Sequence, residues 1–215
     1  MVENVVYLIR HGESVANTQG IYQGQTYDTD LSALGEKQVN ALGVFLAQKP
    51  IDRIIASPLK RTRDTAEAIA KWHDGLTVEI DPDIIETNHG AWEGKNVHVI
   101  ARLWPEEYRT WQTQPSKAVF PGGETYAETR TRALKWWKEL LPTVRGITAV
   151  VTHDNIVRAL LTDILGIEQD KLWNMELQPA AITKLNITGK TVKVSEVNNT
   201  NHLEGLQANL ANHAL

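Results

Sequence analysis

The sequence predicts an α/β protein built on a largely parallel sheet, and two observations carry this prediction. Short apolar runs of strand length alternate along the chain with longer segments whose apolar residues recur at helical spacing. The 215 residues contain no internal repeat, low-complexity tract or linker rich in Pro, Gly or Ser. We therefore expect a single domain over residues 1–215, with a helical insertion at about residues 95–123.

The expected strands are short and mostly buried. Residues 5–9 are apolar on both faces, as in a strand that is covered from both sides. Residues 51–56 are expected to form a second strand and residues 147–151 another short buried one, and residues 76–80 are a shorter candidate. Residues 181–187 and 191–197 flank a turn that contains glycine, and they are expected to close the sheet as a hairpin.

Amphipathic segments between these strands predict helices. Ser32 has the side chain of an N-cap, and the helix after it is expected to run to about residue 48. Further helices are expected at about residues 59–72, 124–141 and 155–165.

Two regions lack a clear period. Residues 95–121 are rich in Trp, punctuated by Pro and weakly periodic, so they are expected to form short helices beside the sheet. The last dozen residues carry no strong pattern and are expected to form a mobile tail.

Composition excludes several functional classes. The net charge of −4 gives no basic footprint for nucleic acid or for an anionic membrane. The absence of cysteine excludes disulfides, thiolate catalysis and zinc sites built from cysteine. No apolar run reaches the length of a signal peptide core or a membrane span, so a cytoplasmic protein is expected. The seven histidines show no HExxH spacing, and we expect neither a metal nor a cofactor.

Two histidines follow two buried strands. His11 comes after the strand at 5–9, and His153 comes after the strand at 147–151. Ligands of open α/β sheets bind at the carboxyl ends of the strands, so these imidazoles are expected to meet there. Arg10 directly precedes His11, and Arg61 follows the strand at 51–56.

These residue types suit the transfer of a phosphoryl group without a metal. Arginine neutralises phosphate and donates two parallel hydrogen bonds to its oxygens. A histidine nucleophile must be neutral, and Arg10 and Arg61 would disfavour protonation of His11. Glu86, between an apolar pair and a loop that contains glycine, is the candidate general acid. Burial would raise its pKa and the arginines would lower it, and both outcomes stay open.

Seven sequence blocks in order resemble the histidine phosphatase superfamily, which contains cofactor-dependent phosphoglycerate mutases and many small phosphatases. Arg10-His11-Gly12-Glu13 resembles the RHG(E) signature, and Val151-Thr152-His153 resembles the motif of the second histidine. The other five blocks are Gln23-Gly24 with Asp30-Leu31-Ser32-Ala33-Leu34-Gly35, Ser57-Pro58-Leu59-Lys60-Arg61 with Thr65-Ala66-Glu67, Glu86 with Gly90-Ala91-Trp92-Glu93-Gly94, Pro121-Gly122-Gly123-Glu124, and Asn201-His202-Leu203.

The resemblance implies a phosphoglycerate mutase-like fold, a three-layer α/β/α sandwich around a mostly parallel sheet. It also implies a phosphohistidine mechanism. His11 would attack phosphorus, Glu86 would protonate the leaving group, and water would then release phosphate. Arg10, Arg61 and His153 would bind the phosphoryl group of a small phosphorylated substrate, and substrate-binding positions would include Asn17, Gln23, Gly24 and Asp154. Many relatives form dimers, so a homodimer is an open alternative.

The chain departs from the family pattern in three places. Asp154 stands where glycine is common, and we expect its side chain to cap the following helix while its backbone N–H faces phosphate. His89 replaces a commoner apolar residue, and contact with substrate and exposure to solvent are equally open. The insertion lacks the paired arginines of a mutase. A phosphatase is therefore favoured over a mutase, and a non-catalytic phosphate-binding protein is the third alternative.

The substrate itself is not specified by the sequence. Five aromatic residues lie in or near the insertion, and most of them are expected to be ordinary core. Two or three of them at the pocket would suit an apolar or ring-bearing leaving group. They are Trp92, Trp104, Tyr108, Trp111 and Phe120.

Overall fold

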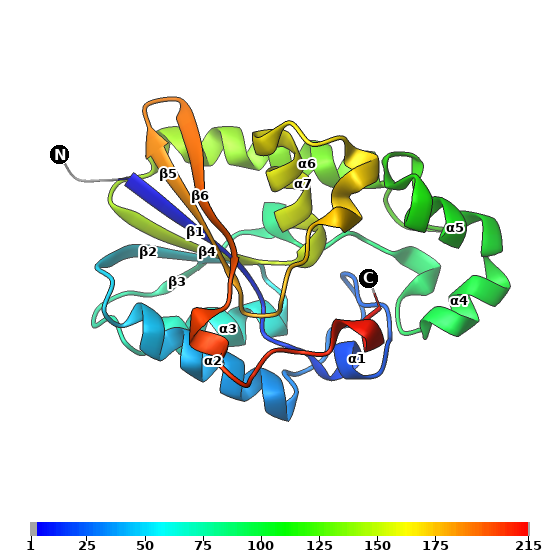
Figure 1. Cartoon of the computed structure of the whole chain (residues 1–215), viewed down its shortest axis with the longest axis horizontal. Coiled ribbons are helices and arrows are strands. Elements are labelled where there is room, and N and C mark those ends of the chain that lie inside the picture. Colours follow the sequence, from blue (N-terminus) through cyan, green and yellow to red (C-terminus); the bar gives the residue numbers. More distant parts are fainter. Residues whose placement is uncertain (1–3, 215) are drawn as a thin grey trace.

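The computed structural model describes residues 4–214, in which six strands form one sheet (Figure 1). The spatial order is β3-β2-β4-β1-β5-β6. Strands β1, β2, β3 and β4 pair in parallel, whereas β5 is antiparallel to both β1 and β6. The predicted, mostly parallel sheet is confirmed. The strands are β1 Asn4–Arg10, β2 Ile51–Ala56, β3 Val78–Ile80, β4 Ile147–Thr152, β5 Ile182–Thr188 and β6 Thr191–Asn199.

Helices cover both faces of this sheet and make the three layers (Figure 1). Helices α2 (Ala33–Leu46) and α3 (Lys60–Ala70) lie on one face, and α6 (Tyr126–Leu140) and α7 (Asp154–Leu165) lie on the other. Residues 5–9 of β1 are all apolar because the strand is covered on both faces. Its alternate side chains enter the two opposite cores, because successive residues of a strand point to opposite faces.

Local signals decide where the helices begin. The Ser32 hydroxyl accepts a hydrogen bond from the Gly35 N–H, so the predicted cap of α2 is confirmed. A reciprocal capping box between Thr125 and Glu128 starts α6. A second box, between Ser14 and Asn17, starts the single turn α1 (Val15–Thr18), which the sequence analysis missed because four residues show no period.

The Trp-rich region at 95–121 forms short helices, as expected. It contains α4 (Val97–Leu103), α5 (Pro105–Thr113) and a 3₁₀ turn at Pro115–Lys117. Trp92, Trp111 and Phe120 are fully buried there, and their rings meet edge to face. Within the described range 4–214, no helix is both long and apolar enough to cross a membrane.

The carboxyl-terminal segment differs from its prediction. The sequence predicts a mobile tail for the last dozen residues, but residues 206–214 lie against the body of the protein. The Gln38 amide donates to the Leu206 carbonyl, and His213 is buried beside Glu13. These polar contacts and the packing of Leu206 and Ala214 against the two cores hold this segment, and such scattered contacts leave no periodic signal. Leu215 lies outside the described residues.

Gly35 allows α2 to pack directly on the loop after β1. A Cβ at this position would lie 1.9 Å from the carbonyl oxygen of Glu13, and a backbone atom cannot swing away. We expect Gly35→Ala to lower the free energy of unfolding by about 2–3 kcal/mol in a urea titration. Asn40→Ala, on the exposed face of the same helix, should change it by less than about 0.5 kcal/mol. Equal midpoints for the two variants would contradict this prediction.

Candidate active site

Neighbouring strands bring the two predicted histidines together. Arg10 at the end of β1 is in register with Thr152 at the end of β4, and one histidine follows each strand. The His11 N–H donates to the Thr152 carbonyl at 3.0 Å, and the centroids of the His11 and His153 rings are 5.4 Å apart. The expected meeting at the sheet edge is confirmed.

His11 is neutral and oriented. Its Nδ1 lies 2.7 Å from the Gly12 carbonyl, so the ring proton sits on Nδ1, and the Nε2 lone pair faces the Arg61 Nε–H at 3.3 Å. Burial lowers the pKa of His11 well below its usual value, and the positive charges of Arg61 and Arg10 lower it further. An unprotonated Nε2, which in the free site accepts the Arg61 Nε–H, is what a nucleophile needs.

Arg61 is held from two sides. It is 1% exposed, its Nη1 pairs with the Asp28 carboxylate at 2.8 Å, and its Nη2 donates to the Gly24 carbonyl at 3.2 Å. Gly24 thus acts through its backbone. A Cβ on residue 24 would lie 2.0 Å from Oε1 of Glu93. The Glu93 carboxylate accepts hydrogen bonds from the backbone N–H groups of residues 25, 26 and 27. The sequence analysis missed Asp28, because an ion pair between residues that are distant in the sequence has no characteristic sequence spacing.

Asp154 bridges two buried arginines. Its Oδ1 is 3.3 Å from Arg10 Nη1, and its Oδ2 is 2.6 Å from Arg158 Nε. The predicted cap is wrong, since His153 holds the N-cap position of α7 and makes no side-chain cap. Burial raises the pKa of Asp154, but Arg158 and Arg10 outweigh it and leave the pKa below its usual value. The i,i+4 spacing of Asp154 and Arg158 was a signal that could have predicted this pair.

Glu86 can carry a proton near neutral pH. Burial raises its pKa to about 7, against opposing hydrogen bonding from the Thr87 N–H and the charge of Arg61. The question left open by the sequence is therefore decided by desolvation. A carboxyl group with this pKa can give and take a proton under physiological conditions.

Arg132 holds the loop that carries Glu86 through hydrogen bonds to its backbone carbonyls. The Arg132 guanidinium donates to the carbonyls of Asp83 and Ile85 at 2.9 and 2.8 Å, and it pairs with the Glu124 carboxylate. The Thr152 hydroxyl adds a bond to the Ile84 carbonyl at 2.7 Å. Arg132 was not predicted from the sequence, although Glu124 belongs to one of the seven blocks.

Further polar side chains, among them Asn17, Gln23 and His89, line the same site. The Asn17 amide oxygen accepts from the Ser14 N–H, which leaves the amide NH₂ group of Asn17 as a donor. The Gln23 amide donates to the Ser14 hydroxyl, and the Gln23 carbonyl contacts Nδ1 of His89. His89 is 4% exposed, so the solvent-facing alternative is wrong, and burial lowers its pKa to about 4.

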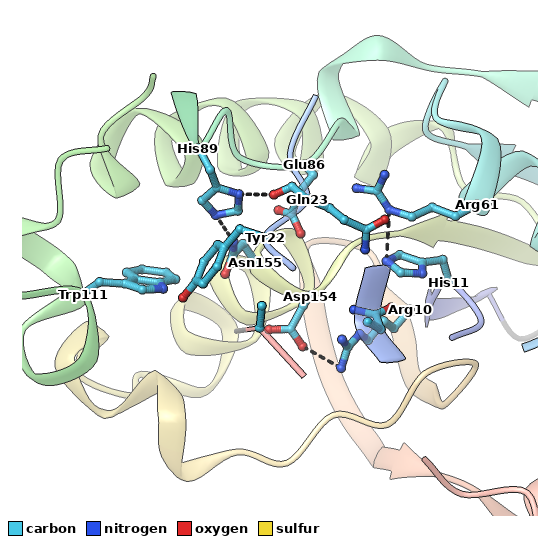
Figure 2. A pocket seen from close by; sticks show the side chains of 12 residues that line it. Arg10, His11, Tyr22, Gln23, Arg61, Glu86, His89, Trp111, Asp154 and Asn155 are labelled. Carbon is cyan, nitrogen blue, oxygen red and sulfur yellow. Dashed lines mark hydrogen bonds and ion pairs between the residues drawn. The ribbon is translucent and has the colours of Figure 1, made fainter. Parts of the chain in front are cut away.

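These side chains surround one pocket with an empty volume of about 390 Å³, including its mouth (Figure 2). His11 and Arg61 lie at one end and Trp111 at the other, and Asn155 lies 3.3 Å from Nε2 of His89. His153 and Gly24 contact the lining without belonging to it. The lining residues are Arg10, His11, Asn17, Tyr22, Gln23, Arg61, Glu86, His89, Trp111, Asp154, Asn155 and Ala214.

Most of the aromatic residues of the insertion are core, as expected. Of the five, Trp111 lines the pocket, while Trp104 and Tyr108 are half-buried against the core.

Among residues 4–214, no three His, Asp or Glu side chains gather closely enough to hold a metal ion.

A three-layer α/β fold with paired histidines and arginines at the strand ends defines a buried, donor-rich site for an anion. The chain belongs to the histidine phosphatase superfamily (branch 1), since the model of this family matches residues 6–200. The resemblance stated from the sequence is confirmed.

Two similar proteins are named as phosphatases, and a solved structure shares the fold. The chain is 35% identical over 197 residues to phosphoserine phosphatase 1 of Hydrogenobacter thermophilus, covering 91% of this chain and 92% of that protein. It is 27% identical over 184 residues to the adenosylcobalamin/alpha-ribazole phosphatase of Salmonella typhimurium, covering 85% and 90%. The solved structure of YhfR from Bacillus stearothermophilus superimposes with a TM-score of 0.87 at 25% identity, covering 93% of this chain and 98% of that one. The predicted class, a phosphoric monoester hydrolase, is confirmed.

Proposed function

We propose that this protein is a metal-independent phosphomonoesterase that acts through a phosphohistidine at His11 on a small phosphorylated metabolite. One observation carries the proposal. A neutral imidazole with an unprotonated Nε2 shares a buried pocket with a carboxyl group whose pKa is about 7. The positive charge that a phosphate ester requires is supplied by Arg10 and Arg61.

In the first step, the His11 Nε2 lone pair attacks phosphorus while the bond to the leaving oxygen breaks. Glu86 gives its proton to that oxygen, so that an alcohol departs instead of an alkoxide. Arg10, Arg61 and His153 hold the phosphoryl oxygens, and the Asn17 amide assists. In the second step, water attacks phosphorus and Glu86 takes a proton from it. The P–N bond then breaks, its electron pair returns to Nε2, and inorganic phosphate leaves.

The far end of the pocket favours a leaving group without a second phosphate. Its lining includes Tyr22, His89, Trp111 and Asn155, and Arg10 and Arg61 are the cations that line the pocket. Burial lowers the pKa of His89 to about 4, so its ring is neutral. A small polar leaving group with hydrogen-bonding groups fits such a wall. The substrates named for the relatives, phosphoserine and alpha-ribazole phosphate, are the first candidates.

The pairing of Asp154 weighs against a non-catalytic binding protein. Its carboxylate is neutralised by Arg10 and Arg158, so it does not leave an uncompensated negative charge in the pocket. Nothing in the lining supplies the extra cations that would hold the second anionic group of a mutase substrate.

The test is phosphate release in the presence of a chelator from phosphoserine, alpha-ribazole phosphate and phosphoglycerates, with a parallel measurement of phosphoglycerate isomerisation. We expect release from at least one ester and no isomerisation. Isomerisation without net release would make the protein a mutase. Loss of all activity in the chelator, restored by a divalent metal, would overturn the metal-independent mechanism.

Glu86→Gln should lower kcat by about 10²–10⁴-fold, because glutamine cannot protonate the leaving oxygen. In the wild type, the protonated fraction of Glu86 falls as the pH rises through about 7, so kcat/KM should decline above that pH. The variant should lose this decline. A matched control is p-nitrophenyl phosphate, whose leaving group needs little protonation and should suffer a much smaller loss. Equal losses for alkyl and nitrophenyl esters would contradict the assignment.

A further inference from the structure

We propose that Ser57 is a positioning residue that fixes the ring proton of His153 on Nδ1, so that an Nδ1–H group faces the transferring phosphoryl group. This inference rests on the proposed function, in which His153 binds phosphoryl oxygen. It assigns a task to a side chain that touches neither substrate nor the reacting atoms.

Ser57 is built into the sheet edge as firmly as the two histidines. It follows the last residue of β2, it is 0% exposed, and its N–H donates to the Val151 carbonyl at 3.1 Å. Its Oγ lies 2.7 Å from Nε2 of His153, which is likewise 0% exposed. This contact therefore joins the end of β2 to the residue after β4, with no water between them.

The other nitrogen of His153 has no partner within residues 4–214. Nδ1 is buried and makes no hydrogen bond there. A buried polar atom without a partner is costly and needs an explanation, and in the proposed function a phosphoryl oxygen supplies the missing partner. Since Nε2 is occupied by Ser57, Nδ1 is the nitrogen through which His153 can bind a phosphoryl oxygen.

The position of one proton then decides whether His153 attracts or repels phosphate. In the ligand-free site the ring is neutral, because burial and the charge of Arg61 lower the pKa of His153 well below its usual value. A neutral imidazole carries a single N–H. If that proton were on Nε2, Nδ1 would present a lone pair to an anionic oxygen. If the Ser57 hydroxyl donates to Nε2 instead, the proton sits on Nδ1 and can be donated to phosphate.

A hydroxyl suits this task because it can donate or accept by rotating. The edge-on contact of His153 with His11, at an angle of 63° between the rings, places the two imidazoles next to each other. His11 keeps its proton on Nδ1 through the Gly12 carbonyl and leaves Nε2 free as a nucleophile. Ser57 would bind His153 at Nε2, so that Nδ1 of this second ring becomes the hydrogen-bond donor.

The test reads the tautomer directly. Wild type, Ser57→Ala and Ser57→Thr are labelled with ring ¹⁵N-histidine, and long-range ¹H–¹⁵N correlations are recorded in saturating inorganic phosphate. His153→Gln assigns the signals. We expect a protonated Nδ1 in the wild type and in Ser57→Thr, and a proton wholly or partly on Nε2 in Ser57→Ala. Phosphate affinity and kcat/KM should fall about tenfold in Ser57→Ala and recover in Ser57→Thr.

A wild-type phosphate complex protonated on Nε2 would overturn the proposal, even if Ser57→Ala failed to fold. An unchanged tautomer in a folded Ser57→Ala would overturn it as well, whatever the loss of activity. Failure of the proposed function looks different. In that case the wild type would release no phosphate from any ester, while the spectra of the phosphate complex would still report the tautomer.

Discussion

His11→Ala is expected to abolish phosphate release, with a loss of kcat on the order of 10⁵-fold for the best substrate. The alanine variant has no lone pair at the position that Nε2 of His11 occupies beside the Arg61 Nε–H. His89 is also neutral, but its two nitrogens contact the Gln23 carbonyl and Asn155. Single-turnover assays in a chelator measure the loss.

Trapping the covalent intermediate makes this prediction specific. Wild type mixed with substrate and quenched in alkali should carry one phosphoryl group on the peptide that contains His11, and His11→Ala should carry none. The exposed His98 provides a matched control, since His98→Ala should retain wild-type turnover and labelling. A phosphoryl group found on another residue, or residual release within tenfold of wild type, would contradict the assignment of His11.

Asp154→Ala is expected to produce the largest loss of stability, about 3–5 kcal/mol. Arg10 and Arg158 are each 3% exposed, and without the carboxylate two buried guanidinium groups would lose their shared partner. Arg10 also donates to the Leu177 carbonyl at 2.5 Å, and Arg158 donates to the Leu172 carbonyl at 2.7 Å. Neither arginine can therefore move into solvent without breaking further hydrogen bonds.

An exposed ion pair supplies the control for this variant. Glu106 and Arg109 are 77% and 72% exposed at the side chain, so Glu106→Ala should cost less than about 1 kcal/mol. In a thermal scan, Asp154→Ala should melt about 10 °C below the wild type and Glu106→Ala within a few degrees of it. Equal melting temperatures would show that the buried triad contributes nothing to stability.

The pH dependence gives a second check. The folded state lowers the pKa of Asp154 below its ordinary value of 3.8. The stabilisation from this carboxylate is therefore fully present above that ordinary value, and it is lost as the pH falls through the lower, folded value. The gap between wild type and Asp154→Ala should be constant near neutrality and should narrow in strong acid.

Interactions between residues distant in sequence account for what the sequence analysis missed. Arg10, His11 and Arg61 were identified because they stand directly after buried strands or near a strand end, and parallel pairing brings such positions together. Asp28 and Arg132 had no such mark. Each is placed by a contact across the fold, Asp28 with Arg61 and Arg132 with the loop before Glu86.

His89 and the carboxyl-terminal segment show the same limit. A histidine in a polar loop has the same sequence whether it faces solvent or a pocket, and burial decided between them. The segment at 206–214 has no hydrophobic periodicity that would predict its packing against the protein. In the structure, however, Ala214 lines the pocket and His213 lies 3.1 Å from Glu13.

The sequence by itself determined the class of fold, the strand ends at which the proposed site lies and the family of the protein. Periodicity and the order of motifs can be read from the sequence without a structure. The protonation states were decided only by the tertiary structure. Burial raised the pKa of Glu86 to about 7, and burial with nearby arginines kept His11 neutral. Desolvation depends on every atom packed around a group, and no local pattern in a sequence records that sum.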